Sequence, residues 1–154
     1  MTGLAIPPAQ GPMVPHPFSS LVSLCDFYDA SLSLAQKTPA VYPAKAIAYM
    51  WARRGSYFEP AYLKAFIQMM GIYPAGSLVR LEGGELAIVT LNHPQNLHRP
   101  QVRLIPSSTR EPSRELNLLE TSGETGEYCH CHSIHEALSP LPFNLDPAKY
   151  LELS

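Results

Sequence analysis

Residues 58–89 read as a helix, a sharp stop and a β-hairpin, and this succession constrains the fold more than any other part of the chain. Pro60 suits the first position of a helix, where no backbone N–H is needed. Apolar residues then recur at helical spacing as far as Gly71, which is suited to ending the helix. Two β-type runs flank Gly83 and Gly84, and paired glycines favour a tight hairpin turn because both accept positive φ. We therefore expect helix and antiparallel sheet to meet here.

Similar turn and helix-end residues along the chain predict an α+β fold. In this fold a three-helix segment precedes a small three- to four-stranded antiparallel sheet and a short C-terminal helix. Residues 1–17 are rich in proline and predict a disordered leader, or the junction to a domain further upstream. Residues 18–154 are expected to form a single domain, with helices in 18–74, a β-hairpin extension in 75–120, and loop plus final helix in 121–154. The expected elements are helices over 18–36, 43–55 and 60–70, strands over 78–81, 86–89, 101–105 and 115–119, one helical turn over 133–138, and a last helix from Pro147 to Leu151.

Helical spacing also predicts which side chains are buried. The first helix is expected to bury Phe18, Leu21, Cys25, Tyr28 and Leu32, and the second to bury Ala46, Ile47, Met50 and Trp51. We expect the aromatic residues at these positions to be core residues, because aromatic side chains contribute much of the buried apolar surface of a domain.

The charge and cysteine content narrow the choice of partner and compartment. A formal net charge of −2, with basic residues scattered along the sequence, argues against binding to nucleic acid or to an anionic membrane. No apolar run approaches the roughly 20 residues that a transmembrane helix needs. Three cysteines are too few for a disulfide framework. These observations predict a cytoplasmic protein.

Ordered motifs over roughly half of the chain resemble the C-terminal part of HD-GYP-type phosphohydrolase domains. These bacterial domains belong to the HD superfamily, and many are metal-dependent cyclic di-GMP phosphodiesterases. The matching segments are LCDFYDA at 24–30, PAKA at 43–46, GSYFEP at 55–60, AFI at 65–67, GIYPAGSLVRL at 71–81, GELAIV at 84–89 and RPQV at 99–102. The resemblance implies a relative of cyclic di-GMP phosphodiesterases that is truncated or degenerate.

The resemblance places Asp26 at the position of the family's last metal ligand. The alternative is that Asp26 and Asp29, three residues apart on the first helix, form a solvated acidic edge. The family binds iron or manganese through further histidines and aspartates, yet this chain contains no His-Asp and no His-His dipeptide. One carboxylate cannot hold and activate a metal-bound water. We therefore expect no catalytic residue and no bound cofactor in this chain alone.

The expected phosphate-binding motif also departs from the family. Where the family has an arginine that meets the substrate phosphates, this chain has Ala35. Lys37 supplies a charge nearby but lacks the bidentate fork of arginine. The sequence thus predicts that both the metal site and the anion contacts are incomplete.

A second, unrelated candidate metal site lies near the C-terminus, in the run Cys129-His130-Cys131-His132 and in His135. Cys129, Cys131, His132 and His135 are residue types that bind zinc, but the C-x-C spacing is tighter than in most zinc sites. A polar loop explains the same residues, and a Cys–His catalytic pair has no orienting group to support it.

Three functions remain open on the sequence. The first is the phosphodiesterase-like protein, catalytically incomplete alone. The second is a non-enzymatic module that binds a protein partner, or a second copy of itself, through an exposed helical face. The third is a small Cys/His metal-binding domain.

Overall fold

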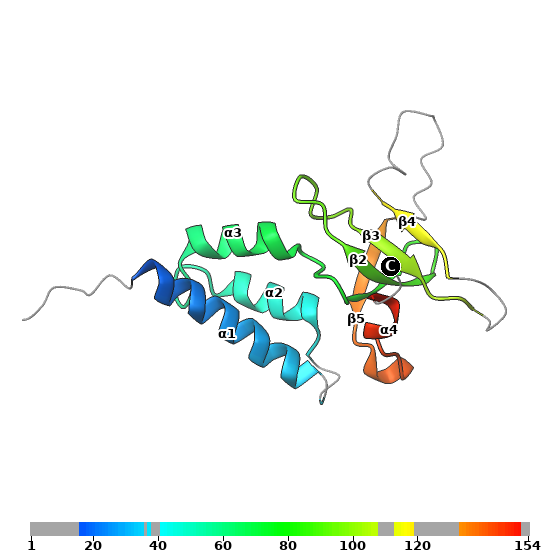
Figure 1. Cartoon of the computed structure of the whole chain (residues 1–154), viewed down its shortest axis with the longest axis horizontal. Helices are drawn as coiled ribbons and strands as arrows, with labels where there is room; N and C mark the ends of the chain where they lie inside the picture. Colours follow the sequence, from blue (N-terminus) through cyan, green and yellow to red (C-terminus); the bar gives the residue numbers. More distant parts are fainter. Residues whose placement is uncertain (1–15, 36, 38–40, 108–112, 119–132, 152–154) are drawn as a thin grey trace, which may run out of the picture.

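The computed structural model describes residues 16–35, 37, 41–107, 113–118 and 133–151. The predicted leader at residues 1–17 lies outside this part of the chain except for its last two residues, and the first helix begins at Pro17. Three helices lie on one side of the molecule, and an antiparallel sheet with a short final helix lies on the other (Figure 1). This arrangement confirms the predicted α+β class.

The helical part comprises α1 (Pro17–Ala35), α2 (Pro43–Ala52) and α3 (Pro60–Met70). Proline occupies the first turn of both α2 and α3, as the sequence predicts. The α3 helix ends where the Gly71 N–H donates to the carbonyl of Ile67, with Gly71 at a φ of 84°. Because a positive φ is unfavourable for residues with a Cβ, glycine is the residue suited to this stop.

The sheet contains β1 (Leu78–Leu81), β2 (Leu86–Leu91), β3 (Gln101–Leu104), β4 (Glu115–Asn117) and β5 (Ile134–Leu138), in the order β4-β3-β2-β1-β5. All four pairings are antiparallel. The predicted hairpin is β1–β2, with Val79 opposite Ala87 and Gly84 at a positive φ in the turn. A short 3-10 helix, η3 (Leu141–Phe143), and α4 (Ala148–Leu151) follow the sheet.

The prediction of a helical turn over residues 133–138 is wrong, because this segment is strand β5. It pairs along β1, with Val79 opposite Ala137 and Arg80 opposite Glu136. The sheet therefore has one strand more than the upper limit that the sequence suggests. The pairing joins segments more than fifty residues apart, and local residue spacing carries no signal for such a partner.

The helices and the sheet enclose separate hydrophobic cores. The helical core is centred on Leu24, Met50 and Leu63, and the sheet core on Val79, Val89 and Val102. On the opposite face of the sheet, α4 approaches the strands, since the Arg103 guanidinium donates to the carbonyl of Tyr150. The described helices include none with the length and apolar character needed to cross a membrane.

The predicted buried faces of α1 and α2 are partly wrong. In α1, Tyr28 is buried as expected and Leu32 is partly buried. Leu24 is also buried in the core, whereas the predicted core residues Phe18, Leu21 and Cys25 are exposed. In α2, Trp51 is 44% exposed although its three predicted partners are buried. Apolar surface on both helices is therefore left outside the helical core.

Candidate functional site

The outward side of α1 carries an exposed apolar band with acidic residues beside it. Phe18 is 72% exposed and Val22 is 56% exposed. Cys25 and Asp29 continue the same side, at the i, i+4, i+7 and i+11 positions of the helix, and both are exposed. We call these four residues the outer stripe of α1. Leu24 and Tyr28, which are buried, point to the other side of the helix.

Asp26 lies beside the outer stripe and is exposed. Neither Asp26 nor Asp29 forms an ion pair with the residues that the structure describes. Within the same residues, no group of three or more histidine, cysteine, aspartate or glutamate side chains is close enough to hold a metal ion. A metal centre that activates water needs several such ligands, so the described residues around Asp26 do not fit one.

The second candidate metal site is only partly visible. Cys129, Cys131 and His132 lie outside the described residues, so their arrangement with His135 is not defined. His135 itself is exposed on β5, the strand at the edge of the sheet beside β1. The zinc hypothesis for these residues stays a prediction.

A second surface of the helical part is a groove of about 500 Å³ between α2 and α3. We call it the α2–α3 groove. Its α2 wall is a stripe at helical spacing, Ala44, Ile47, Ala48 and Trp51. The other wall is formed by Lys64, Ile67 and Gln68 of α3, and Ile72 and Leu97 complete the lining. The lining is therefore predominantly aliphatic and aromatic.

Basic groups lie at the Trp51 end of the α2–α3 groove. The Arg54 guanidinium carbon is 4.6 Å from the centre of the Trp51 ring, and Arg54 Nη1 donates to the Trp51 carbonyl at 2.9 Å. Lys64 lines the groove and is exposed. Neither cation forms an ion pair within the described residues. Cation–π stacking holds the Arg54 charge beside the apolar surface and leaves it available to an anion.

The α2–α3 groove was not among the sites predicted from the sequence. The sequence does contain a pattern that predicts an apolar helix face at this place. The residues at i, i+3, i+4 and i+7 are Ala44, Ile47, Ala48 and Trp51. The positions of Ile47 and Trp51 were instead assigned to the core. A short helix with apolar residues on two sides cannot bury both when it packs against only two other helices.

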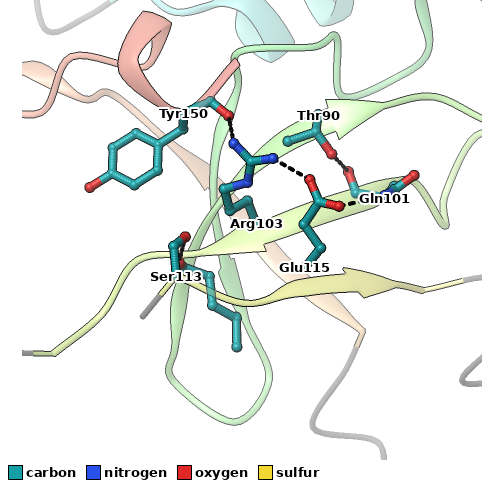
Figure 2. A network of polar contacts seen from close by, with 7 residues as sticks. Thr90, Gln101, Arg103, Ser113, Glu115 and Tyr150 are labelled. Carbon is teal, nitrogen blue, oxygen red and sulfur yellow. Dashed lines mark hydrogen bonds and ion pairs between the residues drawn. The ribbon is translucent and has the colours of Figure 1, made fainter. Parts of the chain in front are cut away.

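A cluster of polar side chains in the sheet has a structural role. Figure 2 shows Arg103 on β3 between the carboxylate of Glu115 on β4 and the carbonyl of Tyr150 on α4. Gln101 donates to the other oxygen of the same carboxylate at 3.2 Å. Arg103 is buried, and the hydrogen-bonded carboxylate offsets the cost of burying its charge. These contacts attach α4 to the sheet.

Part of this chain is similar in sequence to a known enzyme. A curated cyclic di-GMP phosphodiesterase of Pseudomonas aeruginosa is 38% identical over 86 residues. The matched region is 56% of this chain but only 20% of that protein, so the chain spans about one fifth of the length of this relative. The similarity supports a distant relationship to that enzyme. No protein-family model matches the chain, and no solved structure matches it.

Proposed function

We propose that this chain is a distant relative of the C-terminal region of HD-GYP-type cyclic di-GMP phosphodiesterases and does not hydrolyse cyclic di-GMP by itself. The observation that carries the proposal is the 38% identity over 86 residues with such a phosphodiesterase. The motifs at residues 24–30 and 71–81, which resemble that family, agree with it.

The chemistry of Asp26 supports the second half of the proposal. Its carboxylate is exposed on α1, and within the described residues it belongs to no group of three or more metal-binding side chains. A metal-activated water requires an ion held by several ligands, because only then is the ion retained while an open position is kept for water. In the proposed role, Asp26 occupies a ligand position whose co-ligands are not supplied by its described neighbours.

A direct assay tests this proposal. The purified chain is incubated with cyclic di-GMP and either Mn²⁺ or Fe²⁺, and the linear dinucleotide product is quantified by chromatography. We expect no product above the protein-free control. Turnover that is lost in Asp26→Ala would contradict the proposal, since it would show that the chain assembles its own metal centre. Turnover that survives Asp26→Ala would place the chemistry elsewhere in the chain.

The outer stripe of α1 favours a second candidate function, an interaction module. Phe18 and Val22 expose large apolar side chains on one side of a helix, next to carboxylates without an ion-pair partner in the described residues. A contiguous apolar surface with a polar border is typical of a protein-binding site. We propose that this surface is covered by protein in solution.

Light scattering tests the interaction module. We expect the weight-average mass of the wild-type chain to rise with concentration above 17.0 kDa. Val22→Glu introduces a charge at the centre of the outer stripe and should return the chain to the monomer mass. Ser23→Glu is a matched control, because Ser23 is also exposed on α1 but lies on another side of the helix. Equal association of both variants would contradict a role for the stripe.

A further inference from the structure

The outer stripe of α1 and the α2–α3 groove are complementary in shape and in charge. One is a convex helix surface with apolar side chains, with the carboxylate of Asp29 on it and the carboxylate of Asp26 beside it. The other is a concave apolar surface with two cations, Arg54 and Lys64, at one end. A helix laid in a groove between two helices is a recurring mode of protein recognition.

We propose that α1 of one copy of this chain binds in the α2–α3 groove of a second copy. This inference rests on the interaction module proposed above and names the partner surface that the module would use. Both surfaces belong to every copy, and each carries the charges that the other lacks.

The positions of the charges fix the direction in which α1 would lie. Figure 1 shows α2 and α3 running side by side in opposite directions, so Trp51, near the end of α2, lies towards the beginning of α3. Lys64 is therefore at the same end of the groove as Arg54, and Ile72 is at the other end. Asp26 and Asp29 follow Phe18 along α1. The carboxylates would lie at the Arg54 and Lys64 end, and Phe18 would lie towards Ile72 and Leu97.

The burial pattern explains why these two surfaces would be used together. Phe18, Val22 and Trp51 are the large apolar side chains that the helical core leaves exposed on the stripe and at the groove. Transfer of such side chains into an interface stabilises the complex because it removes apolar surface from water. The exposed carboxylates would gain a cation partner at the same time, which fixes direction more than it adds affinity.

The geometry of this contact predicts the form of the assembly. The stripe of one copy meets the groove of another, so the first copy retains a free groove and the second a free stripe. These remaining surfaces either contact each other, which gives a reciprocal two-fold dimer, or bind further copies, which gives a larger ring or an open chain.

Two single variants, each with one surface blocked, test the contact. Val22→Glu blocks the stripe and leaves the groove intact. Ala48→Glu blocks the groove and leaves the stripe intact, and Ala48 is exposed in the isolated chain. Ser23→Glu and Ala65→Glu place the same charge on exposed positions of α1 and α3 outside both surfaces. Circular dichroism shows whether each variant keeps its helix content.

Sedimentation velocity over a concentration series provides the readout. We expect the wild type and both controls to associate, and each blocked variant alone to remain monomeric. An equimolar mixture of Val22→Glu and Ala48→Glu should form a dimer that does not grow further, because only one intact stripe and one intact groove are available per pair.

A charge exchange tests the proposed direction independently. Asp29→Lys and Lys64→Glu should each weaken association about tenfold, which corresponds to about 1.4 kcal/mol. Combined in one chain, they should restore association, because the lysine of one copy then meets the glutamate of the next. Failure of the combined variant to recover would overturn the proposed direction of α1.

The outcomes separate this inference from the function on which it rests. If Val22→Glu abolishes association but Ala48→Glu does not, the stripe is an interface and the groove is not its partner. In that case the inference is wrong and the interaction module stands. A wild-type chain that stays monomeric throughout, or a mixture of the two blocked variants that stays monomeric while the wild type associates, overturns the inference.

Discussion

Gly71 and Asn92 join the end of α3 to the segment that follows β2. Asn92 Nδ2 donates to the carbonyl of Met70 at 2.7 Å, which satisfies one of the free carbonyls at the end of the helix. The backbone at Gly71 lies directly against the Asn92 side chain, and a Cβ added there would be 2.8 Å from Asn92 Nδ2. Gly71 is therefore required both for its positive φ and for this close approach.

We expect Gly71→Ala to lower the free energy of unfolding by about 1–3 kcal/mol, the usual cost of a non-glycine residue at a strained backbone position. Urea unfolding measures the loss. In an Asn92→Ala background the same substitution should cost less, because the overlap with the Asn92 side chain is removed and only the backbone strain remains. Equal costs in both backgrounds would show that the contact with Asn92 is unimportant.

Tyr28 is a second residue whose surroundings change a measurable property, in this case its pKa. Burial raises its pKa from 10.0 to about 12, because the phenolate loses its hydration in the helical core beside Phe66. The folded chain therefore holds this proton at pH values at which the unfolded chain has released it. The contribution of Tyr28 to stability is complete below pH 10 and is lost as the pH rises through about 12.

Tyr28→Phe removes this ionisation and leaves the ring in place. We expect the stability of the wild type to fall more steeply than that of Tyr28→Phe between pH 10 and the raised pKa. Ultraviolet titration of tyrosine should show one late-titrating group fewer in the variant. Identical alkaline profiles for the two proteins would contradict the assignment.

Among the secondary-structure elements, α4 is short and depends on contacts with the sheet. A helix of this length has no stability of its own in water. Asp146 Oδ1 accepts the N–H of Ala148 at 3.1 Å, which satisfies one of the free N–H groups at the start of the helix. Arg103 supplies the tertiary contact, since it binds the Tyr150 carbonyl and the Glu115 carboxylate together (Figure 2).

Arg103→Met should therefore release α4 from the sheet. We expect a loss of about 1.5–3 kcal/mol, the range for hydrogen bonds that involve a charged group, and faster hydrogen exchange in residues 148–151. Arg80→Met is the matched control on the same face of the sheet. Arg80 pairs with Glu136 at 2.5 Å, but both side chains are about two-fifths exposed, so its loss should cost only about 0–1 kcal/mol. Similar losses in the two variants would show that Arg103 has no special role.

The elements also differ in how well the sequence predicts them. Pro60, Gly71 and Gly84 specify a helix start, a helix stop and a hairpin turn through local backbone preferences, and each is observed where expected. Strand β5 was missed because its partner β1 is remote in the sequence. The rotation of the buried face of α1 was missed because apolar residues occupy most of its circumference. Only contact with α2 and α3 decides which of them are buried.

For the whole molecule, the fold was more predictable than the site. The α+β class followed from turn residues and periodicity. The candidate surfaces did not, because an exposed stripe and a groove are defined by what the core leaves uncovered. Asp26 was selected by family resemblance alone. It is exposed on α1, one helical turn after Val22, and its role as a metal ligand stays a prediction.

The sheet part and the helical part of the molecule differ in how completely they bury their apolar side chains. The sheet core contains Val79, Val89 and Val102, each without exposed surface, whereas the helical part leaves two apolar surfaces open. In the proposed account, the sheet and α4 form a stable support, and the helical part carries the contacts to other protein. Asp26 lies in the helical part, on α1.

In the proposed function, Asp26 occupies an inherited ligand position whose co-ligands lie elsewhere in the phosphodiesterase fold. A chimera tests this role, in which the segment of the Pseudomonas aeruginosa phosphodiesterase that corresponds to the motifs at residues 24–102 is replaced by residues 24–102 of this chain. Hydrolysis of cyclic di-GMP is measured with and without Asp26→Ala in the chimera. We expect the chimera to hydrolyse the substrate more slowly than its parent, because Ala35 lacks the phosphate contact of arginine, and we expect Asp26→Ala to abolish that activity. A folded chimera without activity, or one whose activity is unchanged by Asp26→Ala, would contradict the claim.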